Sequence, residues 1–334
     1  MRVTKLQKQV YYLESFSSKY TMKQYQFHLN RFFDHIGSRN DKQITGDNVI
    51  NYIIAMKKDG LSHAYRNNTL NAIKYYTEMN DLPLLNWKKI HNYLGEATTV
   101  NDLRGYTHEE IQKLLEVADA RYRAIILTLA STGMRREALT EIKLNDMEYL
   151  PDYKIYKIKI YKGSRQQQIC FTTPEAAAAI NLHFKLNGRE ASGYFHHISP
   201  MAVSKALRKL NVKSRMRQIA AGARQGQYRE SVPSVHGFRK FAITQMKRAK
   251  IDTEIRKFLV GHSIGVANRY IEFTEDDLLQ EYLKAVDLLT ISEENRLAMK
   301  VEQLQAKQDE IMQLRLEMDK LKQMMITTTT PPAK

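Results

Sequence analysis

Six side chains in the sequence have the types that attack on a phosphodiester requires. Cleaving a DNA strand without a metal ion takes a nucleophile, cationic groups that neutralise the charge on phosphorus, and a proton for the leaving 5′ oxygen. Two arginines, a lysine, two histidines and a tyrosine supply these groups. The six are Arg135, Lys162, His236, Arg239, His262 and Tyr270.

The two arginines suit the neutralising role, because a guanidinium contacts two phosphate oxygens and keeps its charge. Arg135 follows Gly133 at the start of a predicted helix over residues 136–144, where free backbone N–H groups also favour an anion. Arg136 is the neighbouring alternative to Arg135. His236 and Arg239 lie one helical turn apart, so we expect them on one face of a helix.

Tyr270 is one of 19 tyrosines, and it follows His262 closely enough for one loop or helical turn to bring both to one site. A phenol, with a pKa near ~10, needs a base or a positive field to attack at neutral pH. His236 is the expected proton acceptor. Lys162, at the tip of a predicted hairpin, is the expected general acid. Two basic neighbours are alternatives to it, Lys159 and Arg165.

The charge of the chain points to a polyanionic partner. Its 52 Lys and Arg against 36 Asp and Glu give a formal net charge of +16 over 334 residues. Residues 205–250 are rich in Lys and Arg and hold one acid, Glu230. Such a block fits a phosphate-binding surface, and we expect the partner to be double-stranded DNA.

Several classes of protein are disfavoured. Cys170 is the sole cysteine, so an intrachain disulfide and a cysteine zinc site are excluded. The N-terminal residues lack a signal-peptide apolar stretch, and the longest apolar run, residues 124–134, is too short to span a bilayer. We expect a cytoplasmic, nucleoid-associated protein without a membrane segment, cofactor or metal ion, and we interpret His196 and His197 as surface residues.

The first region, residues 1–95, has a helical pattern. Thr21 is the expected cap of a helix that ends at Gly37, a second helix around residues 49–56 stops at Gly60, and a third follows Ser62. A linker is expected at residues 96–106 because of its Gly, Thr and Asn content.

The second domain is expected over residues 107–290. Thr107 and Glu110 form a capping-box pattern, and the helix over residues 121–131 is apolar enough to be buried. Residues 156–161 alternate as in a strand, residues 162–165 form a turn, and residues 168–172 return. Thr173 is the expected cap of the next helix, and residues 202–289 are mainly helical.

The third region is a long polar helix, residues 291–326, followed by an expected disordered tail, residues 327–334. One apolar position recurs every seven residues, and a second is filled only in the later heptads, because Lys300 and Lys307 occupy it earlier. The pattern predicts coiled-coil self-association through residues 292–325. The alternative is a single amphipathic helix lying on the domain.

The order and contexts of the six residues resemble the catalytic domain of the tyrosine recombinases, the phage integrase family, and most of all integrases of archaeal mobile elements. The resemblance implies a mainly α fold with a small antiparallel β-hairpin or sheet, a helical DNA clamp before the catalytic domain, and a tetramer on DNA. It also implies strand transfer through a 3′-phosphotyrosine at Tyr270, with Arg135, Arg239 and His262 on the phosphate. Two departures stand out. The chain has Ala138 where many members carry Glu, with Glu137 as a partial substitute, and its interval from His262 to Tyr270 is one residue short.

Three functions therefore compete. The leading hypothesis is a site-specific DNA recombinase. A type IB topoisomerase, which relaxes supercoils without fixed target sites, has a similar constellation, and a third possibility is an inactive DNA-binding scaffold. Tyr282 is the alternative nucleophile, although its predicted helix gives it the pattern of a core residue.

Overall fold

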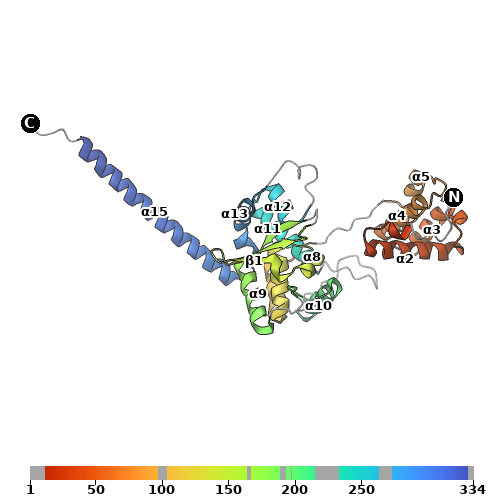
Figure 1. The fold of residues 1–334 in the computed structure, drawn as a ribbon, viewed down its shortest axis with the longest axis horizontal. Helices are drawn as coiled ribbons and strands as arrows, with labels where there is room; N and C mark the ends of the chain where they lie inside the picture. Colours follow the sequence, from red (N-terminus) through yellow and green to blue (C-terminus); the bar gives the residue numbers. More distant parts are fainter. Residues whose placement is uncertain are drawn as a thin grey trace, which may run out of the picture. The chain divides into compact units, whose positions relative to one another are not determined.

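The computed structural model describes residues 12–96, 104–163, 167–188, 193–196, 198–214, 232, 234–262 and 273–329. The chain divides into two compact units, residues 1–101 and 102–334 (Figure 1). Each unit buries its own apolar core.

The first unit is a small helical bundle in which α2 packs against α4. Phe32, Val49, Ile53 and Ile73 lie in its core and are almost fully buried. Its helices are α2 (Lys19–Ile36), η1 (Asp41–Gln43), α3 (Gly46–Lys58), α4 (His63–Met79) and α5 (Trp87–Asn92).

The N-terminal end of α2 corrects one prediction. Thr21 is not the cap, because the hydroxyl of Ser18 accepts the Thr21 N–H at 3.4 Å and places Thr21 within the helix. Both residues carry hydroxyls, and the intervening sequence has no apolar periodicity to distinguish them. The predicted end of the helix at Gly37 is confirmed, since Gly37 has φ +67° and closes the last turn.

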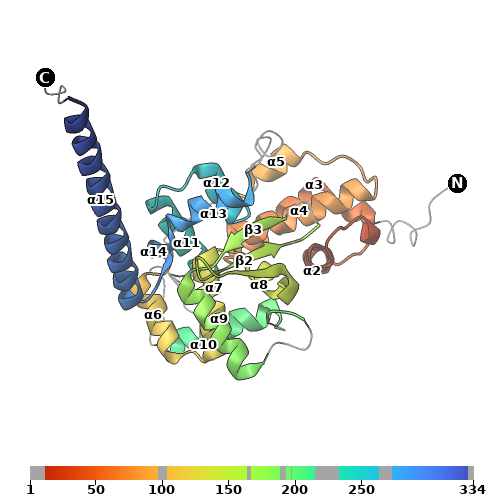
Figure 2. The ribbon, with the colours of Figure 1, turned by 60° about the vertical axis from the view of Figure 1, so that its left-hand side comes forward.

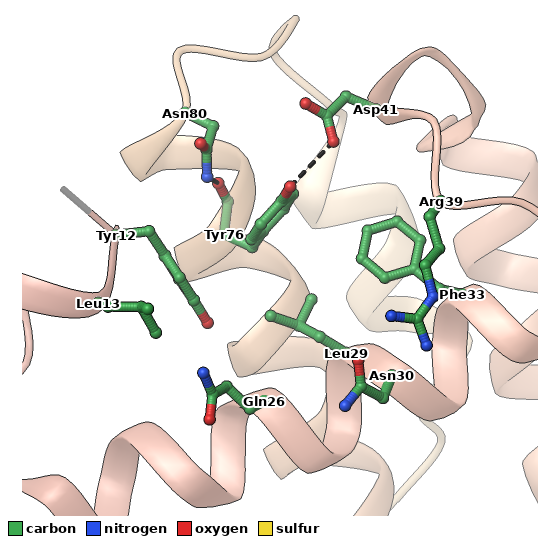
Figure 3. Close-up of a pocket in the computed structure, with 10 residues that line it drawn as sticks. All are labelled: Tyr12, Leu13, Gln26, Leu29, Asn30, Phe33, Arg39, Asp41, Tyr76 and Asn80. Carbon is green, nitrogen blue, oxygen red and sulfur yellow. Dashed lines mark hydrogen bonds between the residues drawn. The ribbon is translucent and has the colours of Figure 1, made fainter. Parts of the chain in front are cut away.

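A cavity of about 490 Å³ opens in this unit, and Figure 3 shows its lining. Tyr76 donates a hydrogen bond to the Asp41 carboxylate at 2.9 Å. Burial, followed by this hydrogen bond, raises the pKa of the Tyr76 phenol well above its ordinary value. The phenol is therefore a neutral donor, and the cavity contains none of the residues predicted to act on phosphate.

The second unit surrounds a buried central helix, α7. Nine consecutive residues, 124–132, are buried, as expected for a helix that is apolar on all sides. Helices α9 and α11 pack against it. The helices of this unit are α6 (His108–Val117), α7 (Ala120–Thr132), α8 (Arg136–Glu141), η2 (Leu144–Asp146), α9 (Pro174–Asn187), α10 (Pro200–Lys213), α11 (His236–Arg248), α12 (Thr253–Leu259), α13 (Glu275–Leu283), α14 (Val286–Leu289) and α15 (Glu293–Thr329).

An antiparallel sheet of order β1-β2-β3 lies beside these helices (Figure 2). The predicted hairpin is confirmed as β2 (Ile155–Ile160) and β3 (Gln168–Phe171), with Ile160 opposite Gln168. A third strand, β1 (Met147–Leu150), was not predicted. It is an edge strand of four residues, of which the middle two are exposed, and it is too short for a recognisable alternation.

The cap predictions in this unit hold. Thr107 and Glu110 form the predicted capping box at the start of α6, and Thr173 caps α9 with Pro174 at its first position. The interpretation of His196 as a surface residue is wrong, because its ring is fully buried and lies 4.9 Å from the ring of His183. His197 lies outside the described residues.

The last helix, α15, begins on the second unit. The Glu175 carboxylate accepts the backbone N–H groups of Ile291 and Ser292 at 2.7 and 3.1 Å. Met299 packs partly against the core, whereas the apolar residues farther along the helix are exposed. None of the helices in the described residues is both long and apolar enough to cross a membrane.

Tyr282 on α13 is a core residue. Its ring is fully buried, and its hydroxyl donates a hydrogen bond to the Ser131 carbonyl of α7 at 3.1 Å. Burial raises the pKa of this phenol well above its ordinary value. The tyrosinate is therefore disfavoured, which argues against Tyr282 as the nucleophile.

We predict that Tyr282→Phe destabilises the second unit by about 1–2 kcal/mol, because the Ser131 carbonyl loses its buried donor. Urea unfolding followed by far-UV circular dichroism measures this loss. Trp87, the sole tryptophan, lies in the first unit, so the transition in its fluorescence is the internal control and stays in place. An unchanged circular dichroism midpoint would contradict the hydrogen bond.

Candidate active site

The turn after α7 directs Arg135 out of the core. Gly133 ends the helix with φ +62°, a conformation that glycine adopts without strain. Met134 then turns inward and is buried, and Arg135 stands at the start of α8 with an exposed side chain. The turn thus places Met134 in the core and the neighbouring Arg135 on the surface.

Gly133 also brings α7 against α11. A Cβ on Gly133 would lie 2.9 Å from the Cβ of Ala242, so a side chain would force the two helices apart. The Gly133 carbonyl accepts a hydrogen bond from Nη1 of Arg239 at 2.7 Å. One glycine therefore positions both arginines, one through the chain and one through space.

Arg239 is buried, with only 4% of its surface exposed. Burial, followed by the nearby charge of Arg135, lowers the pKa of its guanidinium to about 10. Its Nη2 atom is buried without a hydrogen-bond partner. A buried cationic donor without an acceptor is costly, and an anion at this point would satisfy it.

His262 is held by the end of α12. The N–H groups of Gly261 and His262 bond to the carbonyls of Phe258 and Lys257 at 2.9 and 2.8 Å, which is a Schellman motif. The Gly261 carbonyl in turn accepts Nη1 of Arg135 at 2.6 Å. The predicted Gly-His pair thereby contacts the first predicted arginine directly.

The pKa values of the two histidines show that these groups share one electropositive site. The pKa of His236 is lowered by burial and then by Arg239, Lys240 and Arg135. The pKa of His262 is lowered by burial and then by Arg239, Arg135 and His236. The structure therefore gathers Arg135, His236, Arg239 and His262, and both imidazoles favour their neutral form.

Arg136, the alternative to Arg135, is engaged elsewhere. It donates to the Glu137 carboxylate at 2.5 Å and to the Ser204 hydroxyl at 2.8 Å. Glu137 is thus paired with Arg136, which leaves it poorly placed to substitute for the glutamate that many members carry at position 138. The helices that begin at Arg136 and His236 lack a side-chain cap, so their first N–H groups remain open to an anion.

The hairpin places Lys162 in an exposed turn between β2 and β3. Its alternative Lys159 forms an ion pair with Glu275 at 2.7 Å, and Lys157 is paired with the same carboxylate. Lys162 has no ion pair within the described residues, which favours it as the lysine free to meet a substrate. Arg165, the other alternative, lies outside the described residues.

Tyr161 is a residue at this site to which sequence reasoning assigns no role. It has φ +53°, which is unusual for an aromatic residue, and its ring packs partly against the core. The pKa of its phenol is raised by burial first, while the charges of Arg135 and Arg239 oppose that rise. In the sequence, only its position next to Lys162 indicates that Tyr161 lies at the candidate site.

Tyr270 lies outside the described residues. The chain before it reaches His262, and the chain after it resumes at Phe273, whose ring lies 6.2 Å from that of Phe258 on α12. Glu275, two residues later, is bound to β2 through Lys157 and Lys159. The flanks of the predicted nucleophile are therefore anchored to the elements that carry His262 and Lys162.

The segment just before α6 is seated on α11. A Cβ on Gly105 would lie 2.8 Å from the backbone nitrogen of Phe241, and the Tyr106 ring packs at a tilt against that of Phe238, with ring centroids 4.5 Å apart. The Tyr106 N–H donates to the Gly237 carbonyl at 3.4 Å. The end of the expected linker thus contacts the helix of His236 and Arg239.

Comparison with known proteins identifies this arrangement. A model of the phage integrase family matches residues 105–276, which span all six predicted residues. The chain belongs to the phage integrase family. Residues 105–276 are accordingly a tyrosine recombinase catalytic domain, and the protein is an enzyme of site-specific DNA recombination. A search of curated proteins finds no match to the chain.

Solved structures share the fold of this integrase. The Tn1549 transposon integrase in complex with transposon right end DNA is 16% identical, with a TM-score of 0.58 over 85% of this chain and 99% of that one. A lambda integrase dimer bound to a core site is 14% identical, with a TM-score of 0.56 over 80% and 95% of the two chains. XerH recombinase bound to a palindromic difH substrate is 19% identical, with a TM-score of 0.53 over 78% of each chain. At these identities the likeness shows the fold.

Metal-binding side chains do not cluster in the part of this integrase that the structure describes. Within the described residues, no group of three or more His, Cys, Asp or Glu side chains is arranged to hold a metal ion. The cationic groups of the site are instead the guanidiniums of Arg135 and Arg239.

We predict that Arg135→Ala raises the pKa of His236 toward its ordinary value of about 6.5, because one positive neighbour is removed. Titration of the imidazole C–H signals by NMR measures the change. His108 is the control, because its pKa is lowered first by burial and is influenced by Arg296 and Arg248, so it does not respond. A His236 titration that Arg135→Ala leaves unchanged is incompatible with the shared site.

We predict that Gly261→Ala costs more stability than Gly37→Ala. Both glycines end a helix at a similar positive φ, so both substitutions carry the backbone cost of roughly 1 kcal/mol. A methyl group at Gly37 meets open space, whereas one at Gly261 collides with the buried Gln168 side chain, which adds about 1–3 kcal/mol. Urea unfolding followed by circular dichroism measures the loss in Gly261→Ala. Trp87 fluorescence measures the loss in Gly37→Ala, because both residues lie in the first unit. Equal losses would show that the contact with Gln168 imposes no constraint.

Proposed function

We propose that this recombinase cuts and rejoins DNA strands through a 3′-phosphotyrosine formed at Tyr270, without ATP or a metal cofactor. The observation that carries the proposal is the convergence of Arg135, Arg239, His236 and His262, with one buried guanidinium N–H group lacking an acceptor. A scissile phosphate at this point would supply that acceptor and neutralise the charges that the site brings together.

In the proposed complex Arg135 and Arg239 hold the non-bridging phosphate oxygens, with His262 beside them. Both guanidiniums are already fixed by backbone carbonyls, of Gly261 and Gly133, so binding immobilises little additional side chain. As negative charge grows on phosphorus in the transition state, this fixed positive field stabilises it.

Tyr270 is the proposed nucleophile. Because the two residues are three apart in the chain, the Cα of Tyr270 lies within about 11 Å of the Cα of Phe273. The Phe273 ring packs against α12. The field of the two arginines favours the phenolate, and the neutral imidazole of His236 can accept the phenolic proton.

The proposed reaction balances without a further reagent. The Tyr270 oxygen forms a bond to phosphorus, the bond from phosphorus to the 5′ oxygen breaks, and Lys162 donates a proton to that oxygen. The 5′ hydroxyl of a second strand then attacks the phosphotyrosine, and the proton transfers run in reverse. Because the phosphodiester energy is retained in the tyrosine ester, ATP is not required.

We further propose that the protein works as a homo-oligomer on double-stranded DNA, a tetramer at the full site, with the first unit as a helical clamp. Structures of lambda integrase as a dimer at a core site and as a tetramer at a Holliday junction support this assembly by likeness of fold. Coiled-coil association through residues 292–325, a nucleoid-associated location and an origin in an archaeal mobile element belong to the same proposal.

A nicked suicide substrate carrying the cognate site tests the reaction. We expect a covalent protein–DNA adduct from the native chain and none from Tyr270→Phe, since the substitution removes the attacking oxygen and leaves the phosphate-binding residues intact. Denaturing gel electrophoresis measures the adduct, and a DNA-binding titration confirms that the variant still binds. Tyr282→Phe is the matched control and keeps the adduct.

The same assay separates the competing functions. Adducts on DNA of arbitrary sequence would indicate a topoisomerase of type IB. The absence of adducts on every DNA, with binding retained, would indicate an inactive scaffold.

A further inference from the structure

Helix α15 exposes an apolar stripe. In residues 301–322, every side chain that the structure describes is exposed, including Ile311, Leu314, Met318 and Leu321, which have more than half of their surface open to solvent. Exposed large apolar residues on a single helix mark an interaction surface.

The stripe has the spacing of a two-stranded coiled coil from Ile311 onward. Ile311 and Met318 occupy the first seam position of the heptad, a, and Leu314 and Leu321 occupy the second, d. A β-branched residue at a and leucine at d favour two strands. Earlier in the helix Lys300 and Lys307 fall at d, so the well-formed seam begins at Ile311.

The charges that flank this seam specify the partner and its direction. Glu310 and Glu317 stand at the g positions, and Arg315 and Lys322 stand at the e positions. In a parallel pair, each g residue meets the e residue five positions farther along the other helix. Glu310 then faces Arg315 of the other copy, and Glu317 faces Lys322, so every such contact joins opposite charges.

In an antiparallel pair, the same residues would bring like charges together. It places g beside g and e beside e, so glutamates would face glutamates and basic residues would face basic residues. Within the side chains that the structure describes on α15, these four residues form no ion pair of their own that would offset the repulsion.

We propose that residues 310–322 of two copies of this chain form a parallel, in-register coiled coil. The occupant of the stripe is a second copy, because the sequence complements itself only in that direction. The inference deepens the proposed self-association by assigning its register and polarity. Since the seam is short, we expect weak pairing in free solution and stronger pairing when DNA holds two copies close together.

The start of α15 links such a pair to the catalytic domain. The half-buried Glu175 carboxylate accepts the N–H groups of Ile291 and Ser292, and Met299 packs on the core. The helix therefore leaves the domain from a fixed point, and a parallel pair would bring the catalytic domains of both copies to the same end of the coil.

Cysteine cross-linking in the full chain tests the register. Leu314→Cys and Leu321→Cys, made separately, are each expected to yield a disulfide-linked dimer on a non-reducing gel, because like d positions meet only in a parallel, in-register pair. Leu316→Cys is the matched control. It has almost the same exposure as Leu314, 54% against 55%, but lies at the outer f position, so we expect at least about tenfold less cross-linking. The native Cys170 is buried and does not contribute.

Charge exchange tests the polarity. Glu310→Lys with Glu317→Lys is expected to reduce cross-linking through Leu314→Cys at least about tenfold, and adding Arg315→Glu with Lys322→Glu is expected to restore it. Cross-linking of only one of the two cysteine variants, or none above the control, overturns the proposal. The DNA-adduct assay on the same preparations is an independent measurement. If cross-linking fails but the protein–DNA adduct still forms, the coiled coil is contradicted and the proposed reaction is not. If cross-linking succeeds but no protein–DNA adduct forms, only the proposed reaction is contradicted.

Discussion

The site is organised around a cation that the fold keeps out of water. Arg239 is buried, close enough to a second guanidinium for its pKa to be lowered, and only part of its donor capacity is used by the Gly133 carbonyl. Such an arrangement opposes folding, and the surrounding core must compensate for it. The α7–α11 contact, with Phe238, Phe241 and Ala242 fully or almost fully buried, provides that compensation.

The same constraint explains why the site is built from helix ends and not from loops alone. The end of α7 positions Arg135, the start of α11 positions His236, and the end of α12 positions His262. Each of these points is fixed by backbone geometry, through Gly133, the first turn of α11 and the Schellman motif at Gly261. Repulsion between the two guanidiniums would otherwise separate Arg135 from Arg239, so this rigidity suits the phosphate binding that we propose.

Much of this could be predicted from the sequence, where the signal is local. Capping patterns at Thr107 and Thr173, the alternation in β2 and the apolar run of α7 each depend on neighbouring residues, and each prediction holds. Burial that depends on distant segments could not be read in this way. His196 is buried next to His183 of α9 and near Arg121 of α7. Arg136 bonds to Ser204, Lys159 pairs with Glu275, and the proximity of Tyr161 to both arginines likewise arises from folding.

The seat of Gly105 and Tyr106 on α11 has a mechanical consequence. The absence of a side chain at Gly105 lets the backbone lie against Phe241, and Tyr106 is hydrogen-bonded to the turn that carries His236. A displacement of the chain at Gly105 and Tyr106 would therefore act on the helix that holds Arg239, and on α6, to which Arg104 is bound through Glu110. The backbone just before α6 and the first turn of α11 thus move together, so the position of Arg239 depends on a segment that carries none of the six predicted site residues.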